Sequence, residues 1–183
     1  MRRVSILGWA LLLSSLSPCI AWADQTNKWS ATSDLLAVGL PAVAGLMAYT
    51  EGDSEGLKQL ALAQASTVAS SEVLKGLFKA PRPNGSNNRS FPSGHTAVAF
   101  SAASYVDLRY GSGLGLWRPV LYGVAGLVGV GRVEAKEHRW VDVIGGAALG
   151  YGITAYWAES SQAGRLVVLP SPGGLGLAWQ QSF

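Results

Sequence analysis

The sequence predicts an all-α protein, a compact bundle of about five helices embedded in a membrane, with a short extended tail or hairpin at its C-terminus. Only 14% of the 183 residues are charged, whereas about a quarter are charged in ordinary soluble domains. Apolar stretches of helical length recur and are separated by short segments rich in Gly, Pro, Asn and Ser. The 23 glycines allow the close helix contacts typical of membrane bundles, and Gly145, Gly146 and Gly150 are expected to be such contact points in the last helix. The chain length leaves room for one domain.

The N-terminus has the pattern of a secretory signal peptide over residues 1–23. The basic pair Arg2–Arg3 precedes an apolar run over residues 4–16, and Ala21–Ala23 forms an A-x-A cleavage site. We therefore expect cleavage before Asp24 and export across the inner membrane of a bacterium. The alternative is an uncleaved first transmembrane helix.

Residues 24–160 are predicted to form the helical domain. Its five apolar segments lie at residues 34–49, 57–78, 94–108, 119–130 and 141–157. Pro41 is expected to kink the first helix, and Asp53 or Ser54 to cap the second. Residues 80–90 form a loop, after which Ser93 caps the third helix.

Residues 161–183 are predicted to form a separate C-terminal tail. Two short apolar runs, at residues 166–169 and 175–179, flank a Pro- and Gly-rich turn. This pattern indicates two extended segments, possible partners in a hairpin.

Several predicted helices are shorter than the roughly 20 residues that cross a bilayer. They form either a compact membrane bundle or the core of a soluble periplasmic protein. With an exported N-terminus, alternating helices place segments 75–89 and 132–142 on the periplasmic side and 111–118 on the cytoplasmic side. Arg118 in that cytoplasmic segment follows the positive-inside rule, whereas the four basic residues of segment 75–89 break it. Basic residues on the side that the positive-inside rule disfavours indicate that this segment binds a ligand.

The basic residues of segment 75–89 indicate an anion site. No acidic residue occurs over residues 73–106, which contain Lys75, Lys79, Arg82 and Arg89. Both histidines of the chain stand close to this cluster in short motifs. The motifs are Lys75-x6-Arg82-Pro83, Pro92-Ser93-Gly94-His95 and Arg132-x5-His138-x3-Asp142.

In order and spacing, these motifs resemble the three signature motifs of the type-2 phosphatidic acid phosphatase superfamily, which is related to vanadium haloperoxidases. The resemblance spans Lys75 to Asp142, and the helices around the motifs cover most of the mature chain. It implies that His138 attacks phosphorus to form a phosphohistidine. It also implies that His95 protonates the leaving oxygen, and that Asp142 orients His138.

Elementary chemistry supports a phosphate site at the same residues. Phosphoryl transfer spreads negative charge over three oxygens, so positioning and electrostatic stabilisation dominate its catalysis. Arg82 and Arg132 offer forked donors, and Lys75 offers a point charge. Ser93 offers a hydroxyl, and Gly94 places backbone N–H groups at a helix start. If the last helix begins by His138, then His138 and Asp142 share one of its faces.

The chain departs from the resembled pattern at Gly131, where the family usually has a serine. A serine would offer phosphate a hydroxyl, so we expect Gly131→Ser to raise activity, unless the local backbone has come to depend on glycine.

The predicted function is hydrolysis of a lipid phosphate or diphosphate at the periplasmic side of the inner membrane. The alternatives are a soluble periplasmic acid phosphatase acting on small esters, a vanadium-type haloperoxidase, and a non-catalytic membrane protein. The sequence has no metal-ligand spacing and no nucleic-acid motif, so we expect no metal, no cofactor and no nucleic-acid partner. No motif indicates an oligomeric state.

Overall fold

A computed structural model describes residues 25–158, 165–171 and 174–180. Its described residues form five long α-helices, a short 3₁₀ helix and two strands. These elements are α2 (Gln25–Thr50), α3 (Ser54–Phe78), α4 (Gly94–Tyr110), η2 (Gly111–Gly113), α5 (Trp117–Glu134), α6 (Trp140–Trp157), β1 (Arg165–Ser171) and β2 (Gly174–Gln180). The predicted all-α bundle is confirmed, whereas the predicted signal peptide lies outside the described residues.

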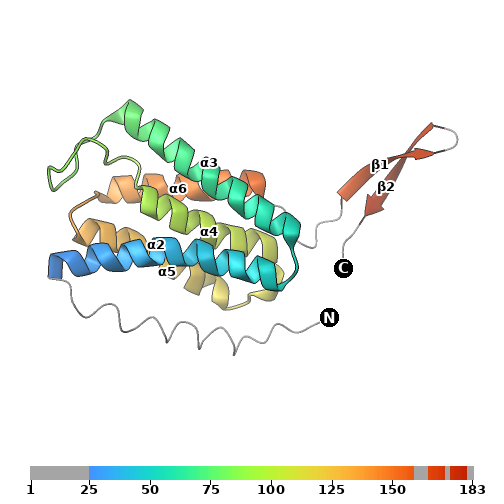
Figure 1. Ribbon diagram of the computed structural model, residues 1–183, viewed down its shortest axis with the longest axis horizontal. Coiled ribbons are helices and arrows are strands. Elements are labelled where there is room, and N and C mark those ends of the chain that lie inside the picture. The colour runs from blue at the N-terminus through green and yellow to red at the C-terminus, as the bar shows by residue number, and fades with distance from the viewer. Residues whose placement is uncertain (1–24, 159–164, 172–173, 181–183) are drawn as a thin grey trace.

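The C-terminal tail contains the predicted hairpin. Strands β1 and β2 pair antiparallel, with Arg165 opposite Gln180 and Ser171 opposite Gly174. Figure 1 shows the five helices as one bundle and the hairpin beyond the end of α6.

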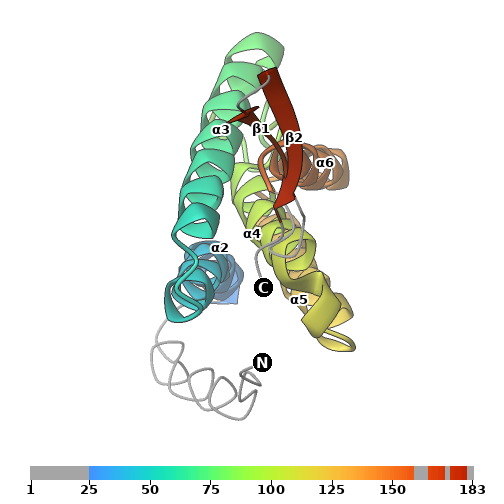
Figure 2. The same ribbon diagram turned by 90° about the vertical axis from the view of Figure 1, so that its right-hand side faces the viewer.

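Helix α4 is the centre of the bundle and packs against α2, α3, α5 and α6 (Figures 1 and 2). Its buried side chains are mostly small, which allows the neighbouring helices to approach closely. They include Ala97, Ala99, Ser101, Ala102, Ala103 and Ser104.

Helix α6 makes the closest approach to α4, through the glycines that the sequence predicted to be contact points. A Cβ on Gly146 would overlap the carbonyl oxygen of Ser93, and one on Gly150 would overlap that of Ala97. One turn further along, Thr154 donates a hydrogen bond to Ser101 Oγ at 2.8 Å. Because α6 is locked against α4, the motif residues at the start of each helix are held together.

Helix α2 begins earlier than expected, at Gln25, because the polar stretch before residue 34 is helical. Nothing in that stretch breaks a helix, and two of its polar side chains have partners on other elements. Ser30 donates a hydrogen bond to Glu137, and Ser33 lies beside Arg132. The stretch is therefore polar because it borders the site described below.

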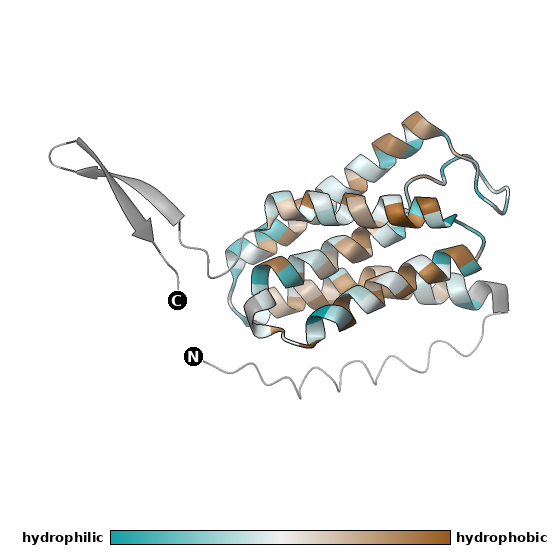
Figure 3. Cartoon of the chain, turned by 180° about the vertical axis from the view of Figure 1, so that it is seen from behind, coloured by the Kyte–Doolittle hydropathy of each residue, from teal (hydrophilic) through white to brown (hydrophobic). Residues whose placement is uncertain are grey.

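Within the described residues, α2 is the one helix long and apolar enough to cross a membrane, over Lys28–Thr50. Only 22% of its most apolar window is buried inside the bundle, and Val38 and Tyr49 are among its exposed residues. Figure 3 shows apolar residues along the visible faces of the helices and a hydrophilic loop between α3 and α4. Length and composition therefore agree with a membrane-facing α2.

Candidate active site

The three motifs meet at one end of the bundle. The Asn84 N–H, in the α3–α4 loop, donates to the carbonyl of Lys136 at 3.0 Å, and the Ser93 N–H donates to that of Asp142 at 2.9 Å. These two bonds tie the first and second motifs to the third, which runs from the end of α5 to the start of α6. Residues separated by up to 67 positions in the sequence therefore surround one site.

His138 is buried at the centre of this site, with 2% of its surface exposed. It lies just before α6, which begins at Trp140, so the condition under which His138 and Asp142 would share a face of this helix is not met. His138 Nδ1 nevertheless lies 3.9 Å from Asp142 Oδ2. The extended backbone at Arg139, just before α6, brings the imidazole to the carboxylate, and helical spacing does not.

Asp142 is held rigidly by two other groups. Its Oδ2 accepts a hydrogen bond from Ser90 Oγ at 2.6 Å and one from the Arg139 N–H at 2.8 Å. The second bond caps the start of α6. The carboxylate is therefore fixed in place beside the His138 ring.

His138 is neutral at physiological pH. Burial lowers its pKa to about 4, and the positive charges of Arg82 and Arg132 act in the same direction. Asp142 and the backbone of Ser90 oppose this shift only in part. A neutral imidazole has a free lone pair, as a nucleophile requires.

Arg82 and Arg132, predicted to bind phosphate, are brought together by Glu137. Arg82 Nη1 donates to Glu137 Oε2 at 3.0 Å, and Arg132 Nη2 donates to the same oxygen. The other oxygen, Oε1, accepts from Ser30 Oγ of α2 at 2.8 Å. Glu137 thus holds two guanidinium groups side by side despite their mutual repulsion.

Sequence reasoning did not identify Glu137, Asp34 or Ser30 as site residues. Asp34 Oδ1 lies 2.5 Å from Arg132 Nη1 and 3.1 Å from His95 Nε2. A signal for Glu137 was available, since it precedes His138 within the third motif. Ser30 and Asp34 are i and i+4, one face of a helix, but the stretch was not recognised as helical.

Lys75 reaches the start of α4 from α3 because the residue there is glycine. A Cβ on Gly94 would lie 2.9 Å from Lys75 Nζ. Lys75 Nζ also pairs with Glu72 Oε1 at 2.8 Å, and Glu72 pairs in turn with Arg89 of the following loop. Gly94 therefore provides both the helix start that was predicted and the space for the lysine.

Ser93 occupies the N-cap position of α4 but does not cap the helix with its side chain. It is fully buried, and its hydroxyl forms a hydrogen bond with Thr96 Oγ1 at 2.9 Å. The predicted capping bond is therefore absent here, and the hydroxyl remains next to the site.

His95 is partly exposed on the first turn of α4. Burial lowers its pKa to about 4, and the charge of Arg132 adds to this effect. The nearby carboxylate of Asp34 acts in the opposite direction, and Lys75 and Arg82 lower the pKa further. The ring is thus neutral in the unliganded protein at pH 7.

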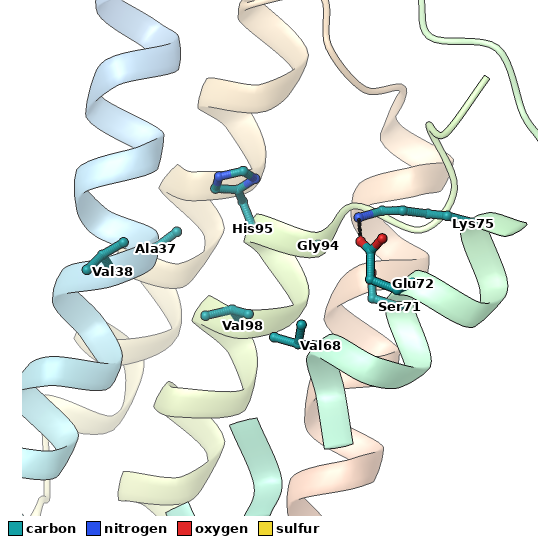
Figure 4. A pocket seen from close by; sticks show the side chains of 9 residues that line it. All are labelled: Ala37, Val38, Val68, Ser71, Glu72, Lys75, Gly94, His95 and Val98. Atoms are coloured by element: carbon teal, nitrogen blue, oxygen red, sulfur yellow. Dashed lines mark hydrogen bonds and ion pairs between the residues drawn. The ribbon is translucent and has the colours of Figure 1, made fainter. Parts of the chain in front are cut away.

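A cavity of about 260 Å³ opens beside His95, between α2, α3 and α4. Figure 4 shows His95, Gly94 and Lys75 at one end and apolar side chains at the other. The apolar lining residues are Ala37, Val38, Val68 and Val98. The cavity is therefore polar where it meets the cations and apolar along the helices.

Gly131 lies where α5 packs against α2. A Cβ there would lie 2.9 Å from Ser33 Cβ and 3.1 Å from the Trp29 carbonyl oxygen. Ser33 Oγ, which accepts from Arg132 Nη1 at 3.4 Å, would be 3.5 Å from that Cβ. A hydroxyl from α2 therefore stands close to where a serine at residue 131 would place its own.

No cluster of three or more His, Cys, Asp or Glu side chains that could hold a metal ion occurs in the described part of the chain. The site consists of imidazoles, cations and the carboxylates paired with them. This donor set suits an anion.

Comparisons with known proteins agree with the geometry. Residues 56–164 match the family model of the PAP2 superfamily. The chain is 31% identical over 144 residues to the lipid A 4'-phosphatase of Helicobacter pylori, covering 72% of this chain and 70% of that protein. It is 41% identical over 78 residues to the lipid A 1-phosphatase of Porphyromonas gingivalis, covering 42% of this chain but only 18% of that protein.

The fold also matches a solved structure. The crystal structure of Aquifex aeolicus LpxE aligns with a TM-score of 0.60 and 26% identity, over 74% of this chain and 87% of that one. The matched family segment contains all three motifs, which surround a single site in the structure. The chain therefore belongs to the PAP2 superfamily, also known as the type-2 phosphatidic acid phosphatase superfamily.

Proposed function

We propose that this protein is a phosphatase that removes a phosphate group from a lipid through a phosphohistidine intermediate. One observation carries the proposal: the positive charges of Arg82 and Arg132 act on both the buried His138 and the partly exposed His95. Two relatives are lipid A phosphatases by name, so a lipid A phosphate is the first substrate to test. The apolar cavity beside His95 supports a lipid over a small polar ester.

In the first step, His138 attacks phosphorus through Nε2 while the bond from phosphorus to the lipid oxygen breaks. His95 gives its proton to that oxygen, which leaves as an alcohol. Arg82, Arg132 and Lys75 stabilise the charge on the three remaining phosphoryl oxygens. A bound phosphate dianion favours the protonated form of His95, so the acid forms in the complex.

In the second step, water attacks phosphorus and the P–N bond to His138 breaks. Neutral His95 now accepts a proton from the water, and inorganic phosphate is released. The Asp142 carboxylate stabilises the imidazole as its charge changes through the cycle. The protein returns to its initial protonation state.

We place the site at the periplasmic face of the inner membrane. Helix α2 has the length and composition of a membrane span, and its site end carries Ser30 and Asp34. The predicted signal peptide supports export of this end. A soluble periplasmic acid phosphatase is the alternative, and extraction by salt without detergent would favour it.

The test is phosphate release by detergent-purified protein from lipid A, phosphatidic acid and p-nitrophenyl phosphate. We expect turnover of one of the lipids at a kcat/KM well above that for the soluble ester, and none with His138→Ala. His95→Ala should lose most turnover, yet it should still be labelled by ³²P from a substrate whose leaving group needs no proton. Labelling of His138→Ala would contradict the assignment of the nucleophile, and a preference for the soluble ester would contradict the lipid substrate.

A further inference from the structure

Asp34 lies outside all three motifs, yet it contacts two of their residues at once. Its Oδ1 is 3.1 Å from Nε2 of His95, the residue expected to protonate the leaving oxygen. The same oxygen is 2.5 Å from Arg132 Nη1, a donor expected to bind phosphate. A single carboxylate oxygen from α2 therefore connects the acid–base residue of α4 with a phosphate-binding residue of α5.

The position of Asp34 is set by close packing of α2 on α5. The preceding residue, Ser33, is buried against Gly131, where the backbones approach too closely for a larger residue to fit without movement. Arg132 follows Gly131, so the same contact brings Asp34 to its guanidinium. The Asp34 side chain remains half exposed, and its partner His95 lines the cavity.

We propose that Asp34 is a positioning residue that aligns His95 and Arg132 on the same phosphate group and supports the protonated form of His95. This role rests on the proposed phosphatase function. It concerns a residue of α2, an element that contributes nothing to the sequence motifs.

The charges around His95 explain why such a residue is needed. Arg132 from α5, Lys75 from α3 and Arg82 from the α3–α4 loop all disfavour a proton on the ring. Glu137 and Glu72 pair with these cations, and Asp142 lies beside His138 on the α6 side. Of these carboxylates, Asp34 is the one paired with the His95 ring. Without it, three cations would face an imidazole that must become protonated to act as an acid.

The first experiment measures His95 directly and needs no turnover. The chain contains only two histidines, so NMR of histidine-labelled protein follows both rings, and His138→Gln assigns the signals. In Asp34→Asn we expect the pKa of His95 to fall below the value measured in the wild type, because the one carboxylate that raises it is removed, with a smaller change for His138. An unchanged His95 titration would overturn the proposal, whether or not the protein proves to be a lipid phosphatase.

The second experiment uses kinetics on the lipid cleaved fastest by the wild type. Asp34→Asn should lower kcat/KM at least tenfold and move the high-pH limb of its pH profile to lower pH. Asp34→Glu keeps the charge and should recover part of the activity. Glu55→Gln removes an exposed carboxylate at the far end of α3 and should change neither quantity.

A competing role for Asp34, as a stand-in for the phosphate group, predicts the opposite kinetic result. If Asp34 merely occupies the phosphate position and must be displaced, Asp34→Asn should bind vanadate more tightly and raise kcat/KM. Either gain would refute a positioning role. Matching circular dichroism spectra and melting curves for the variants would show that the comparison is between folded proteins.

Discussion

Single carboxylates hold the cations of this site in place. Glu137 accepts hydrogen bonds from both Arg82 and Arg132. The Ser30 hydroxyl donates to its other oxygen and fixes its position. Two guanidinium groups repel each other unless an anion lies between them. In the unliganded protein that anion is Glu137, so it keeps the pair preorganised for phosphate.

Replacement of Glu137 by glutamine tests this arrangement. The amide keeps the size of the side chain but loses the charge, so Arg82 and Arg132 should separate and phosphate contacts should weaken. We expect kcat/KM to fall by at least an order of magnitude, about 1.4 kcal/mol of transition-state stabilisation, with weaker vanadate inhibition. Glu134→Gln, at an exposed position one turn earlier, is the matched control. Equal activity of the two variants would show that the arginines need no carboxylate between them.

At the scale of elements, glycines decide how closely helices pack, and close packing places the motifs. The glycines of α6 on α4 bring Asp142 to Ser93, and Gly131 of α5 brings Arg132 to Asp34. Sequence analysis identified the α6 glycines as contact points. For Gly131 the sequence left two possibilities open, a missing hydroxyl and a local backbone that depends on glycine.

Two glycines of α6 provide a matched comparison. A Cβ on Gly150 would overlap the Ala97 carbonyl and lie 2.9 Å from Ser101 N, whereas one on Gly152 would have no neighbour within 4 Å. Gly150→Ala should therefore lower the melting temperature by about 5 °C or more, because backbone atoms of α4 must move. Gly152→Ala should leave it unchanged or raise it, because alanine favours helix. Equal effects of the two changes would refute this account of the α4–α6 contact.

The structure favours the second possibility for Gly131→Ser, in which the local backbone depends on glycine. A serine Cβ would meet Ser33 and the Trp29 backbone, so we now expect the change to lower both kcat/KM and the melting temperature. Ser33→Gly in the same chain removes the closer obstacle and should restore part of both losses. Measurement of the four variants as a double-mutant cycle isolates the coupling between the two residues. Additive effects would show that the two side chains do not compete for this space.

At the scale of the whole molecule, the two ends of the bundle serve different purposes. The site lies at the start of α4, and a second buried polar cluster lies at its end, 17 residues or about 25 Å away. There Asp53, which caps α3, accepts hydrogen bonds from Arg109 Nε at 2.7 Å and Nη2 at 2.6 Å. The Tyr110 hydroxyl donates a further bond to Asp53 at 2.7 Å. This cluster ties the α2–α3 turn to the end of α4.

Asp53→Asn should reduce the stability of the fold without changing catalytic activity. Burial alone raises the pKa of Asp53, but the bonds from Arg109, Tyr110 and Gly56 outweigh it and lower the pKa to about 2. Asparagine still caps a helix but removes the carboxylate charge that pairs with Arg109. We expect a loss of about 2–3 kcal/mol in the free energy of unfolding at pH 7, with kcat/KM unchanged below the melting transition.

The pH dependence of this loss provides its control. A carboxylate with a lowered pKa stabilises the fold fully above its unfolded value of 3.8, and less as the pH falls towards 2. The difference in melting temperature between wild type and Asp53→Asn should therefore shrink from pH 5 downwards. A difference that stays constant over this range would contradict the role of the charge. Glu55→Gln, in the same turn but exposed, should show little difference at any pH.

The sequence alone determined the helical bundle, the C-terminal hairpin and the residues of the three motifs. Periodic apolar runs encode helices locally, and turn residues mark their ends, so these features need no knowledge of distant contacts. The motif residues were recognisable because their chemistry suits phosphate and their spacing resembles a known family. Lys75, Arg82, His95, Arg132, His138 and Asp142 were all named in this way.

Only the tertiary structure decided how those residues act together. Asp34 and Ser30 come from a helix without a motif, and they reach the site because α2 packs on α5. His138 meets Asp142 through an extended segment, although helical spacing had been expected. Gly131 proved to be a packing residue, since its neighbours on α2 lie about 100 positions away in the chain. Such contacts depend on the balance of packing over the whole bundle, which no local pattern in the sequence records.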